Sequence, residues 1–433
     1  LRHHRPGAEN APSAATSATS SRAPSSKTAA PRRQTPQKTA QARNPVVPRA
    51  SGLPFFDDGP DDGWLPRVPV EKSGLKVPAV AELIAEAKRR DSDTLIVIHR
   101  DQLVVDRAFA YRSPIETQSI TKTVAGLAVL ALVADGVIPS LDTPVRRYLP
   151  SVRGEGAPVT LRHVLSHSSG LALGDAVSHP PGLGAADDRT AYAAALPREH
   201  PPGTRFRYNN AAAQLIAGVV LGAAEEPLDR FVGRRIFRPL GIAARDVRWT
   251  RDRSGRVQSY FGLQLSARAL AQLGRWLLAE GRWEGASLLP AALVREAASP
   301  SAVALSHGLF FWRRATFRPT PVAVARWPFL TPLAKRSFRT EEAFFAAAGE
   351  LAPAAAVAGL IASHPRAVRL LREFPDERDG FYAAGGLGQR LVIYPRYGLV
   401  AVRQHRRRPG DEQRERYLHW RAFQAEVEAM LTP

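Results

Sequence analysis

Two residues of the sequence, Ser119 and Lys122, have the types and the spacing of a nucleophile and its base. A serine hydroxyl attacks poorly until a base accepts its proton, and a lysine whose charged form is disfavoured by burial can be that base. On a helix, positions i and i+3 share a face, so the Lys122 amine would lie beside the Ser119 hydroxyl at the helix N-terminus. The alternative is that Ser119 only caps the helix and that Lys122 is a surface charge.

Ser-x-x-Lys occurs a second time, at Ser73–Lys76, so the pattern alone is weak evidence. In that copy Gly74 lies inside and Pro78 follows, which predicts a poor helix and no fixed face for the two side chains. Ser119 instead precedes the apolar run Val124–Ala134, which predicts a buried helix. We therefore take Ser119 as the candidate nucleophile.

A second candidate element is Tyr208–Asn209–Asn210, the only Tyr-x-Asn in the chain. It stands at the start of an apolar helical run, Ala211–Val220. A phenol held near a lysine can relay a proton, and the Asn210 amide can hold a substrate carbonyl. The alternative is a tyrosine packed on the core beside an Asn that caps the helix.

The third candidate element is the glycine-rich stretch Ala383–Gln389, which leads into a predicted strand. Gly385 and Gly386 permit a substrate to approach the backbone closely, and the strand can supply an N–H to a developing oxyanion. The alternative is a flexible strand entry or a bulge with no part in binding.

The elements around these residues predict an α+β fold. Apolar runs predict two β-hairpins, whose strands are Thr94–His99 with Leu103–Ala110, and Arg390–Tyr394 with Leu399–Gln404. Helical spacing predicts three long helices, Ala79–Arg90, Ser119–Ala134 and Glu412–Leu431. We expect an antiparallel sheet built from the N- and C-terminal hairpins and flanked by helices, with residues 140–300 as a mainly helical inserted subdomain. A cleft between the two is the natural ligand site.

The order Ser-x-x-Lys, Tyr-x-Asn and glycine-rich strand resembles the penicillin-recognising serine hydrolases. The nearest branch holds class C β-lactamases, D-alanyl-D-alanine carboxypeptidases, esterases and 6-aminohexanoate-dimer hydrolases. Connecting stretches share the resemblance: Ala134–Gly136, Leu141–Val145, Tyr148–Pro150, Val159–Leu171, Leu265–Ala271 and Gly281–Gly285. The resemblance covers residues 70 to 430 approximately and implies the β-lactamase/transpeptidase-like fold.

The resemblance also implies a role for each candidate residue. Ser119 would be the acylated nucleophile, with Lys122 and Tyr208 as general base and proton relay. Asn210 would orient the substrate, and the N–H groups of Ser119 and Gly386 would form the oxyanion hole. The implied reaction is cleavage of an ester or amide through an acyl-enzyme that water then resolves.

One position departs from the family pattern. Members that recognise a β-lactam or a peptide carboxylate usually carry Lys or His where this sequence has Ala383. Alanine offers neither charge nor a hydrogen bond, which favours esterase or amidase chemistry over true β-lactamase activity. The same departure keeps an alternative open, a catalytically weak or inactive envelope-associated binding protein of the same fold. Since relatives of this type are mostly exported, the expected location is the periplasm or cell envelope, and a cytoplasmic location stays open.

Composition limits the class and the partners. The chain has 433 residues, 44% of them hydrophobic, a net charge of +20 and no cysteine. This excludes disulfide-stapled and wholly disordered classes and a cysteine nucleophile. Residues 1–64 are expected to be a disordered Arg/Ala/Ser/Pro-rich tail, and residues 65–433 the hydrolase domain. The expected partner is a small-molecule or peptide-like acyl substrate. The basic tail is a candidate contact for an anionic surface.

Other classes of partner are not expected. The basic residues form no compact run interleaved with aromatic residues, so nucleic-acid binding is not predicted. The apolar core of residues 124–134 has half of the roughly 20 residues that a membrane crossing needs, so no transmembrane segment is predicted. His163 and His167 have the i, i+4 spacing of zinc ligands, but no Glu stands at position 164 and no third ligand is evident. We predict no metal and no cofactor.

Residues 313–378 form a basic and aromatic insertion, longer than the typical family connector. It could line the cleft or contact an anionic surface. A solvated insertion without either role is an equal alternative.

Overall fold

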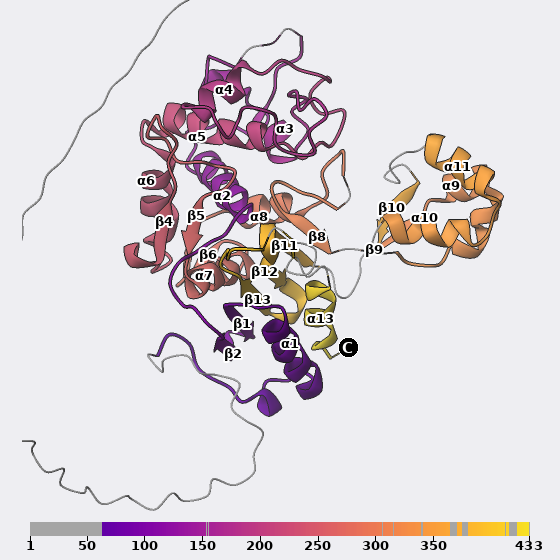
Figure 1. Cartoon of the computed structure of the whole chain (residues 1–433), viewed down its shortest axis with the longest axis horizontal. Helices are drawn as coiled ribbons and strands as arrows, with labels where there is room; N and C mark the ends of the chain where they lie inside the picture. Colours follow the sequence, from indigo (N-terminus) through magenta and orange to yellow (C-terminus); the bar gives the residue numbers. More distant parts are fainter. Residues whose placement is uncertain are drawn as a thin grey trace, which may run out of the picture. The chain divides into compact units, whose positions relative to one another are not determined.

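The computed structural model describes residues 63–152, 154, 156–304, 306–314, 316–338, 341–363, 370–374, 380–411, 413–414 and 422–432. The expected tail, apart from its last two residues, lies outside this range. The main sheet is antiparallel and has the strand order β2-β1-β13-β12-β11-β8 (Figure 1). Its strands are β1 (Thr94–His99), β2 (Gln102–Ala108), β8 (Trp312–Arg314), β11 (Gly380–Gly385), β12 (Gln389–Tyr394) and β13 (Leu399–Gln404).

The two terminal hairpins join in the centre of this sheet, as the sequence predicts. β1 pairs with β13, with Val97 opposite Ala401, and each strand also pairs with its hairpin partner. Beyond β12 the sheet continues into β11 and β8, which the hairpin pattern does not predict. The α+β architecture is therefore confirmed, with a sheet two strands wider than expected.

The alternating side chains of the sheet separate two hydrophobic cores. On one face Leu95 and Val97 pack with α1 (Val77–Arg89) and α13 (Phe423–Ala429). On the other face Ile96 and Ile98 belong to the larger core. Successive strand residues point to opposite faces, so hydrophobic residues at every position mean that both faces are covered.

The expected closing helix, Glu412–Leu431, is shorter in the structure. Gln413 and Arg414 form a turn, and α13 spans only Phe423–Ala429, while residues 412 and 415–421 lie outside the described range.

Near the N-terminal end of the described chain, Pro78 lies in the first turn of α1. Proline is tolerated there because that N–H has no partner within the helix.

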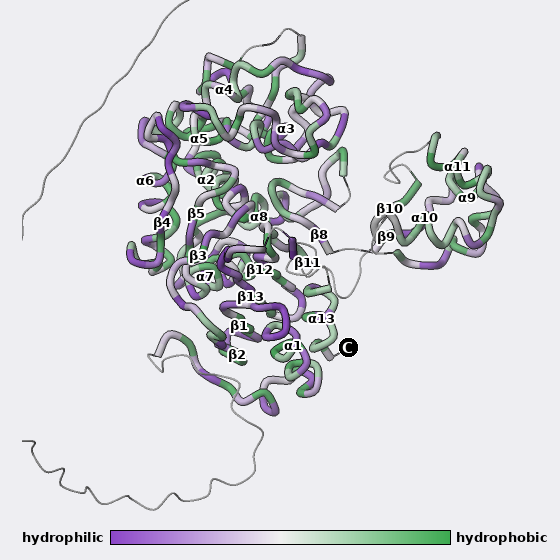
Figure 2. The backbone as a smooth tube through the Cα atoms, viewed as in Figure 1, coloured by the Kyte–Doolittle hydropathy of each residue, from purple (hydrophilic) through white to green (hydrophobic). Residues whose placement is uncertain are grey.

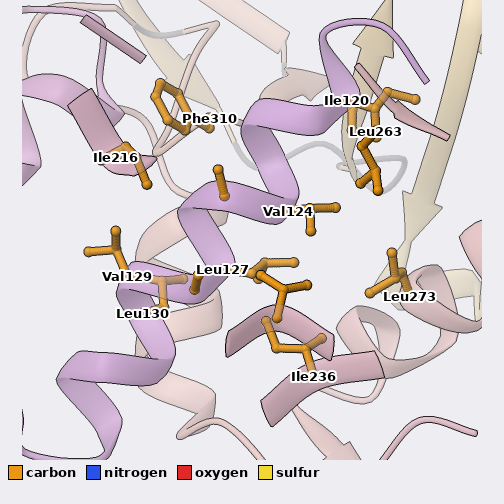
Figure 3. Close-up of a cluster of buried hydrophobic side chains, with 14 of the residues drawn as sticks. Ile120, Val124, Leu127, Val129, Leu130, Ile216, Ile236, Leu263, Leu273 and Phe310 are labelled. Atoms are coloured by element: carbon orange, nitrogen blue, oxygen red, sulfur yellow. The ribbon is translucent and has the colours of Figure 1, made fainter. Parts of the chain in front are cut away.

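The larger core is built around α2 (Ile120–Ala134). Every residue from Ile120 to Leu132 is buried. A helix that is apolar on all sides belongs in the centre of a protein. Figure 3 shows side chains such as Ile216, Ile236, Leu263 and Phe310 gathered around it.

The middle of the chain is mainly helical, as predicted, with a few short strands. Its helices are α3 (Leu161–Leu165), α4 (Arg189–Ala195), α5 (Asn210–Ala224), α6 (Leu228–Val232), α7 (Ala267–Leu278) and α8 (Ala291–Ala298). Its strands are β3 (Ile115–Glu116), β5 (Leu263–Leu265) and β4 (Val247–Trp249) in one small sheet, and the pair β6 (Arg282–Trp283) and β7 (Ala286–Ser287). Figure 2 shows hydrophilic residues along α6 and β4.

Much of the expected insertion forms its own hydrophobic cluster. β8, which contains Arg313, belongs to the main sheet, and the cluster begins with the next strand. Its elements are β9 (Thr316–Pro319), α9 (Pro321–Arg326), α10 (Glu341–Gly349), α11 (Ala354–Ser363) and β10 (Leu371–Phe374), drawn in orange in Figure 1. Phe317, Phe338 and Phe344 are buried within it. These aromatic side chains therefore stabilise the insertion itself.

One further property of the helices concerns membranes. In the described part of the chain, no single helix is both long and apolar enough to cross a membrane. A bent pair, Asn210–Ala224 with Leu228–Phe237 at 74°, meets the length and composition criteria only when both helices are taken together.

Candidate active site

Ser119 and Lys122 meet at the N-terminus of α2. Ser119 occupies the N-cap position, yet its side chain makes no capping hydrogen bond. Instead, Lys122 Nζ lies 3.0 Å from Ser119 Oγ, and it donates a hydrogen bond to the Tyr260 carbonyl oxygen at 2.8 Å. Lys122 is only 2% exposed. The alternative of a capping serine beside a surface lysine is therefore wrong.

Burial sets the charge of this lysine. Removal from water lowers the pKa of Lys122 well below its usual range, because a buried ammonium loses its hydration. Burial is the cause of this shift, and among the described residues no carboxylate opposes it. The site therefore favours a neutral amine facing the Ser119 hydroxyl, which is the form a general base requires.

Tyr208 lies beside both Ser119 and Lys122. Its side chain is hydrogen-bonded with that of Ser119, and Lys122 Nζ lies 4.8 Å from the centroid of its ring. Burial raises the pKa of Tyr208 to about 12, and the Ser119 hydrogen bond opposes this only in part. The phenol is thus protonated near neutral pH. Of the two candidate bases, Lys122 is the one able to accept the serine proton first.

The two asparagines after Tyr208 have different places. Asn209 is the N-cap of α5: its Oδ1 accepts the Ala212 N–H at 3.1 Å, and its Nδ2 donates to the Leu171 carbonyl at 3.0 Å. Asn210 is the first residue of the helix and is half-buried. Its Nδ2 lies 3.4 Å from His179 Nδ1, and its Oδ1 is buried without a hydrogen-bond partner among the described residues. An amide in this state can orient a substrate.

The glycine-rich strand end lies against the residues that precede Ser119. A Cβ on Gly385 would collide with the carbonyl oxygen of Thr117, and one on Gly386 would lie 3.5 Å from Gln118 Oε1. At Gly385 the end of β11 therefore approaches the segment before α2 at a distance that only glycine allows, whereas the contact at Gly386 is an ordinary one. All six sequence candidates, Ser119, Lys122, Tyr208, Asn210, Gly385 and Gly386, fall in this one region.

We expect Gly385→Ala to abolish or strongly reduce activity, because the added methyl pushes β11 away from Thr117. Gly349→Ala is a matched control, since a Cβ at Gly349 meets nothing within 4 Å. Turnover of a chromogenic ester by the two purified variants, with thermal unfolding of each, checks this. Wild-type turnover by Gly385→Ala would show that the close approach is not required.

Ala383 lies two residues earlier on the same strand. It is buried in the cluster that contains Ile120 and Val124 of α2, so it lies on the sheet face that α2 covers. The position offers a methyl group to this face and no charge.

Two buried arginines hold the turn that follows Gly385. Arg390 donates to the carbonyls of Gly385 and Gln389, and Arg403 donates to those of Leu387 and Gly388. Burial lowers the pKa of Arg390 to about 10 and that of Arg403 to about 9. The carbonyls of the turn are thereby tied back into the sheet.

The second Ser-x-x-Lys copy does not form such a site. Ser73 Oγ donates to the Val70 carbonyl at 2.7 Å, and Lys76 is exposed. The structure thus separates the two copies as helix propensity predicts.

Several aromatic residues around Tyr208 have no signal in the sequence. Trp312 of β8 stacks on the Tyr208 ring, with centroids 6.1 Å apart and planes at 15°. His167 packs on the same ring at 4.2 Å, and Phe206 and His307 adjoin His167. These residues come from three separate segments, around His167, Tyr208 and Trp312, so only the folded chain brings the segments together.

Three of the candidate residues are partly exposed to solvent. Ser119, Tyr208 and Asn210 are each half-buried, whereas Lys122 beneath them is not accessible. A hollow of about 860 Å³ lies elsewhere, lined by residues of α6, β4 and their neighbours such as Arg234, Phe237 and Trp249. None of the six candidate residues lines it.

The antiparallel sheet, the buried helix that begins at Ser119 and the helical insertion together define a β-lactamase/transpeptidase-like fold. A solved structure of a putative 6-aminohexanoate-dimer hydrolase from Bacillus anthracis superposes with a TM-score of 0.56 at 16% identity, covering 85% of this chain and 89% of that one. A putative beta-lactamase from Bacteroides dorei gives a TM-score of 0.54 at 16% identity, covering 82% and 98%. At this level of identity the likeness concerns the fold.

The beta-lactamase family profile matches residues 79–425, and the chain belongs to this family. Among curated relatives, esterase EstB of Burkholderia gladioli is 34% identical over 142 residues, 29% of this chain and 36% of that protein. The D-alanyl-D-alanine-carboxypeptidase/endopeptidase AmpH of Escherichia coli K12 is 26% identical over 138 residues, 30% of this chain and 36% of that protein. The chain thus matches about a third of the length of each. The resemblance expected from the three motifs is confirmed.

Proposed function

We propose that this protein is a serine hydrolase that cleaves an ester or a short amide through an acyl-enzyme on Ser119. One observation carries the proposal: the amine of a fully buried lysine, which has no counter-ion among the described residues, lies 3.0 Å from the hydroxyl of a half-buried serine. The contact pairs a nucleophile with a group able to take its proton. The esterase and carboxypeptidase names of the two curated relatives support the same class of reaction.

In the proposed reaction, neutral Lys122 accepts the Ser119 proton as Oγ attacks the substrate carbonyl. The N–H groups of Ser119 and Gly386 stabilise the oxyanion. Tyr208 passes a proton to the leaving alcohol or amine. Water then enters and gives up a proton to the same pair of residues as it attacks the acyl carbonyl. The bond to Ser119 Oγ breaks, the acid leaves, and the pair returns that proton to Oγ, which restores the serine hydroxyl and the neutral amine.

The preference for esters and short amides follows from the surroundings of Ser119. Ala383 supplies no cation for a carboxylate, and the side chains around Tyr208 are Trp312, Phe206 and two buried histidines. Burial lowers the pKa of His307 to about 3 and that of His167 well below its usual range, so both rings are neutral. A neutral acyl group suits such a site better than a β-lactam carboxylate does.

Covalent labelling tests the proposal directly. We expect a fluorophosphonate to form one adduct that peptide mapping places on Ser119, and to block turnover of short-chain p-nitrophenyl esters in proportion to labelling. Denatured protein, in which Lys122 and Ser119 are apart, is the control and should not react. No adduct, or an adduct only on another residue, would overturn the proposal.

A second candidate is a binding protein of the same fold with weak or no catalysis, favoured by the neutral methyl of Ala383 where relatives use a charged group. Absence of both labelling and turnover would favour it. An envelope location, and contact of the basic tail with an anionic surface, are further proposals that rest on the resemblance and on the charge of residues 1–50.

A further inference from the structure

His167 contacts the Tyr208 segment through three separate interactions. Its backbone carbonyl accepts the Arg207 N–H at 2.7 Å. Its Nδ1 accepts the Asn209 N–H at 3.2 Å. Its ring packs on the Tyr208 ring, with centroids 4.2 Å apart and planes at 35°. One histidine therefore holds the residue before Tyr208, the residue after it and the tyrosine ring itself.

The backbone and burial of His167 suit a fixed support. The residue follows α3 and has φ = 53°, a left-handed conformation that is uncommon outside glycine and in which Asn, Asp and His are the enriched residues. Its side chain is 1% exposed and also adjoins Phe310 at 5.0 Å. Since Nδ1 accepts a hydrogen bond, the ring proton is on Nε2, which has no hydrogen-bond partner in the described part of the chain. A nitrogen without a partner relays no proton, so the ring acts by its position.

We propose that His167 is a positioning residue that fixes the Tyr208 phenol over Lys122 and beside Ser119. The inference rests on the proposed function, in which these three residues carry out the chemistry. Loss of the Asn209 contact and of the ring packing leaves Tyr208 free to move. Water then reaches the amine that Tyr208 covers, and the relay to the leaving group loses its alignment.

This role has a signature in the pH dependence. The titratable side chains that bear on Lys122 are Tyr208, Tyr260, His167, His179 and His307. Burial lowers the pKa of each of the three histidines, so they stay neutral at pH 7 and above. The fall of kcat/KM at acid pH (the acid limb) therefore reports the protonation of the Lys122 amine. Hydration of its amine restores the charged form and moves this limb to higher pH.

The experiment compares His167→Ala and His167→Asn with the same changes at His163. His163 is a matched control because its Nδ1 also accepts a backbone N–H, that of Thr160 at 3.3 Å, but this bond caps α3 itself. For each variant we measure thermal unfolding, fluorophosphonate labelling, and the pH profile of kcat and KM with a p-nitrophenyl ester.

We expect His167→Ala to lower kcat about 100-fold with KM within threefold, and to move the acid limb upward by half a pH unit or more. His167→Asn keeps an acceptor near Nδ1 and tolerates the left-handed backbone, but it lacks the ring that packs on Tyr208, so it should recover about tenfold of the loss and not the whole of it. The His163 variants should lower stability without moving the limb. If His167→Ala does not fold, an acid limb in His167→Asn identical to wild type, with kcat unchanged, decides against the proposal.

The outcomes separate this inference from the function beneath it. Variants of His167 and His163 that behave alike, while wild-type protein labels on Ser119 and turns over esters, would overturn the positioning role alone. A wild-type protein that neither labels on Ser119 nor turns over esters would overturn the proposed function.

Discussion

Ser119→Ala is expected to lower kcat/KM for ester hydrolysis by about 10⁴-fold or more, with the fold unchanged. Removing the nucleophile of an acyl-transfer enzyme leaves only the stabilisation given by the oxyanion hole and by binding. Methyl replaces hydroxyl at an N-cap position whose side chain makes no capping bond, so the usual loss of cap stability does not apply. Steady-state turnover of p-nitrophenyl butyrate and the pre-steady-state burst check both points.

The second Ser-x-x-Lys copy provides the control for this substitution. Ser73→Ala removes a buried hydroxyl that donates to the Val70 carbonyl, and it leaves the Ser119 region untouched. This variant should lose some stability and keep full turnover and labelling. If Ser119→Ala kept more than a few per cent of wild-type turnover, water or another side chain would be the nucleophile.

The helix that carries Ser119 and Lys122 could be predicted from the sequence. Ser119 and Lys122 are three residues apart, and the apolar run behind them predicts a buried helix, so their contact follows from local geometry. Ser73–Lys76 fails for an equally local reason: Gly74 has a left-handed backbone between the turn that ends at Lys72 and α1, which begins at Val77, so no helix contains both residues. Local pattern also identified both hairpins, because alternation and turn residues are contained within each.

The side chains that surround Tyr208 could not be predicted from the sequence, for a physical reason. His167 and Trp312 contact the Tyr208 ring only through tertiary packing, and no spacing rule relates three positions so far apart in the chain. His307 adjoins His167 in the same way. The spacing of His163 and His167 suggested a shared helical face, but α3 ends at Leu165 and His167 turns into a left-handed conformation. His163 and His167 therefore do not share a helical face, although they are four residues apart.

The width of the sheet was missed for a related reason. β8 has only three described residues, Trp312–Arg314, and its place beside β11 depends on pairing with a strand more than sixty residues later. In contrast, the glycines at the end of β11 did have a local signal. The collision that a Cβ on Gly385 would make with Thr117 now gives its reason.

Lys122→Met is expected to lower kcat/KM about 10³-fold, because general-base catalysis contributes about 10²- to 10⁴-fold and methionine keeps the length of the side chain without the amine. In the wild type, kcat/KM should fall as the pH drops through the lowered pKa of Lys122, since the charged amine cannot accept the serine proton. The residual activity of the variant should lack this limb. Lys76→Met, at the exposed lysine of the second copy, is the control and should keep the wild-type profile.

The same variant should change how stability depends on pH. Burial lowers the pKa of Lys122 in the folded chain, so between that value and its ordinary value of about 10.4 the unfolded chain binds one more proton than the folded chain. In this pH range the free energy of unfolding of the wild type therefore rises with pH through Lys122. The methionine variant has no amine at this position, so its stability lacks this pH dependence. The melting temperature of Lys122→Met minus that of wild type should therefore be highest below the lowered pKa of Lys122, and should decrease as the pH rises from there to the ordinary lysine pKa of about 10.4. A difference that stays constant across this range would mean that Lys122 is charged in the folded protein, and the amine would then be no base for Ser119.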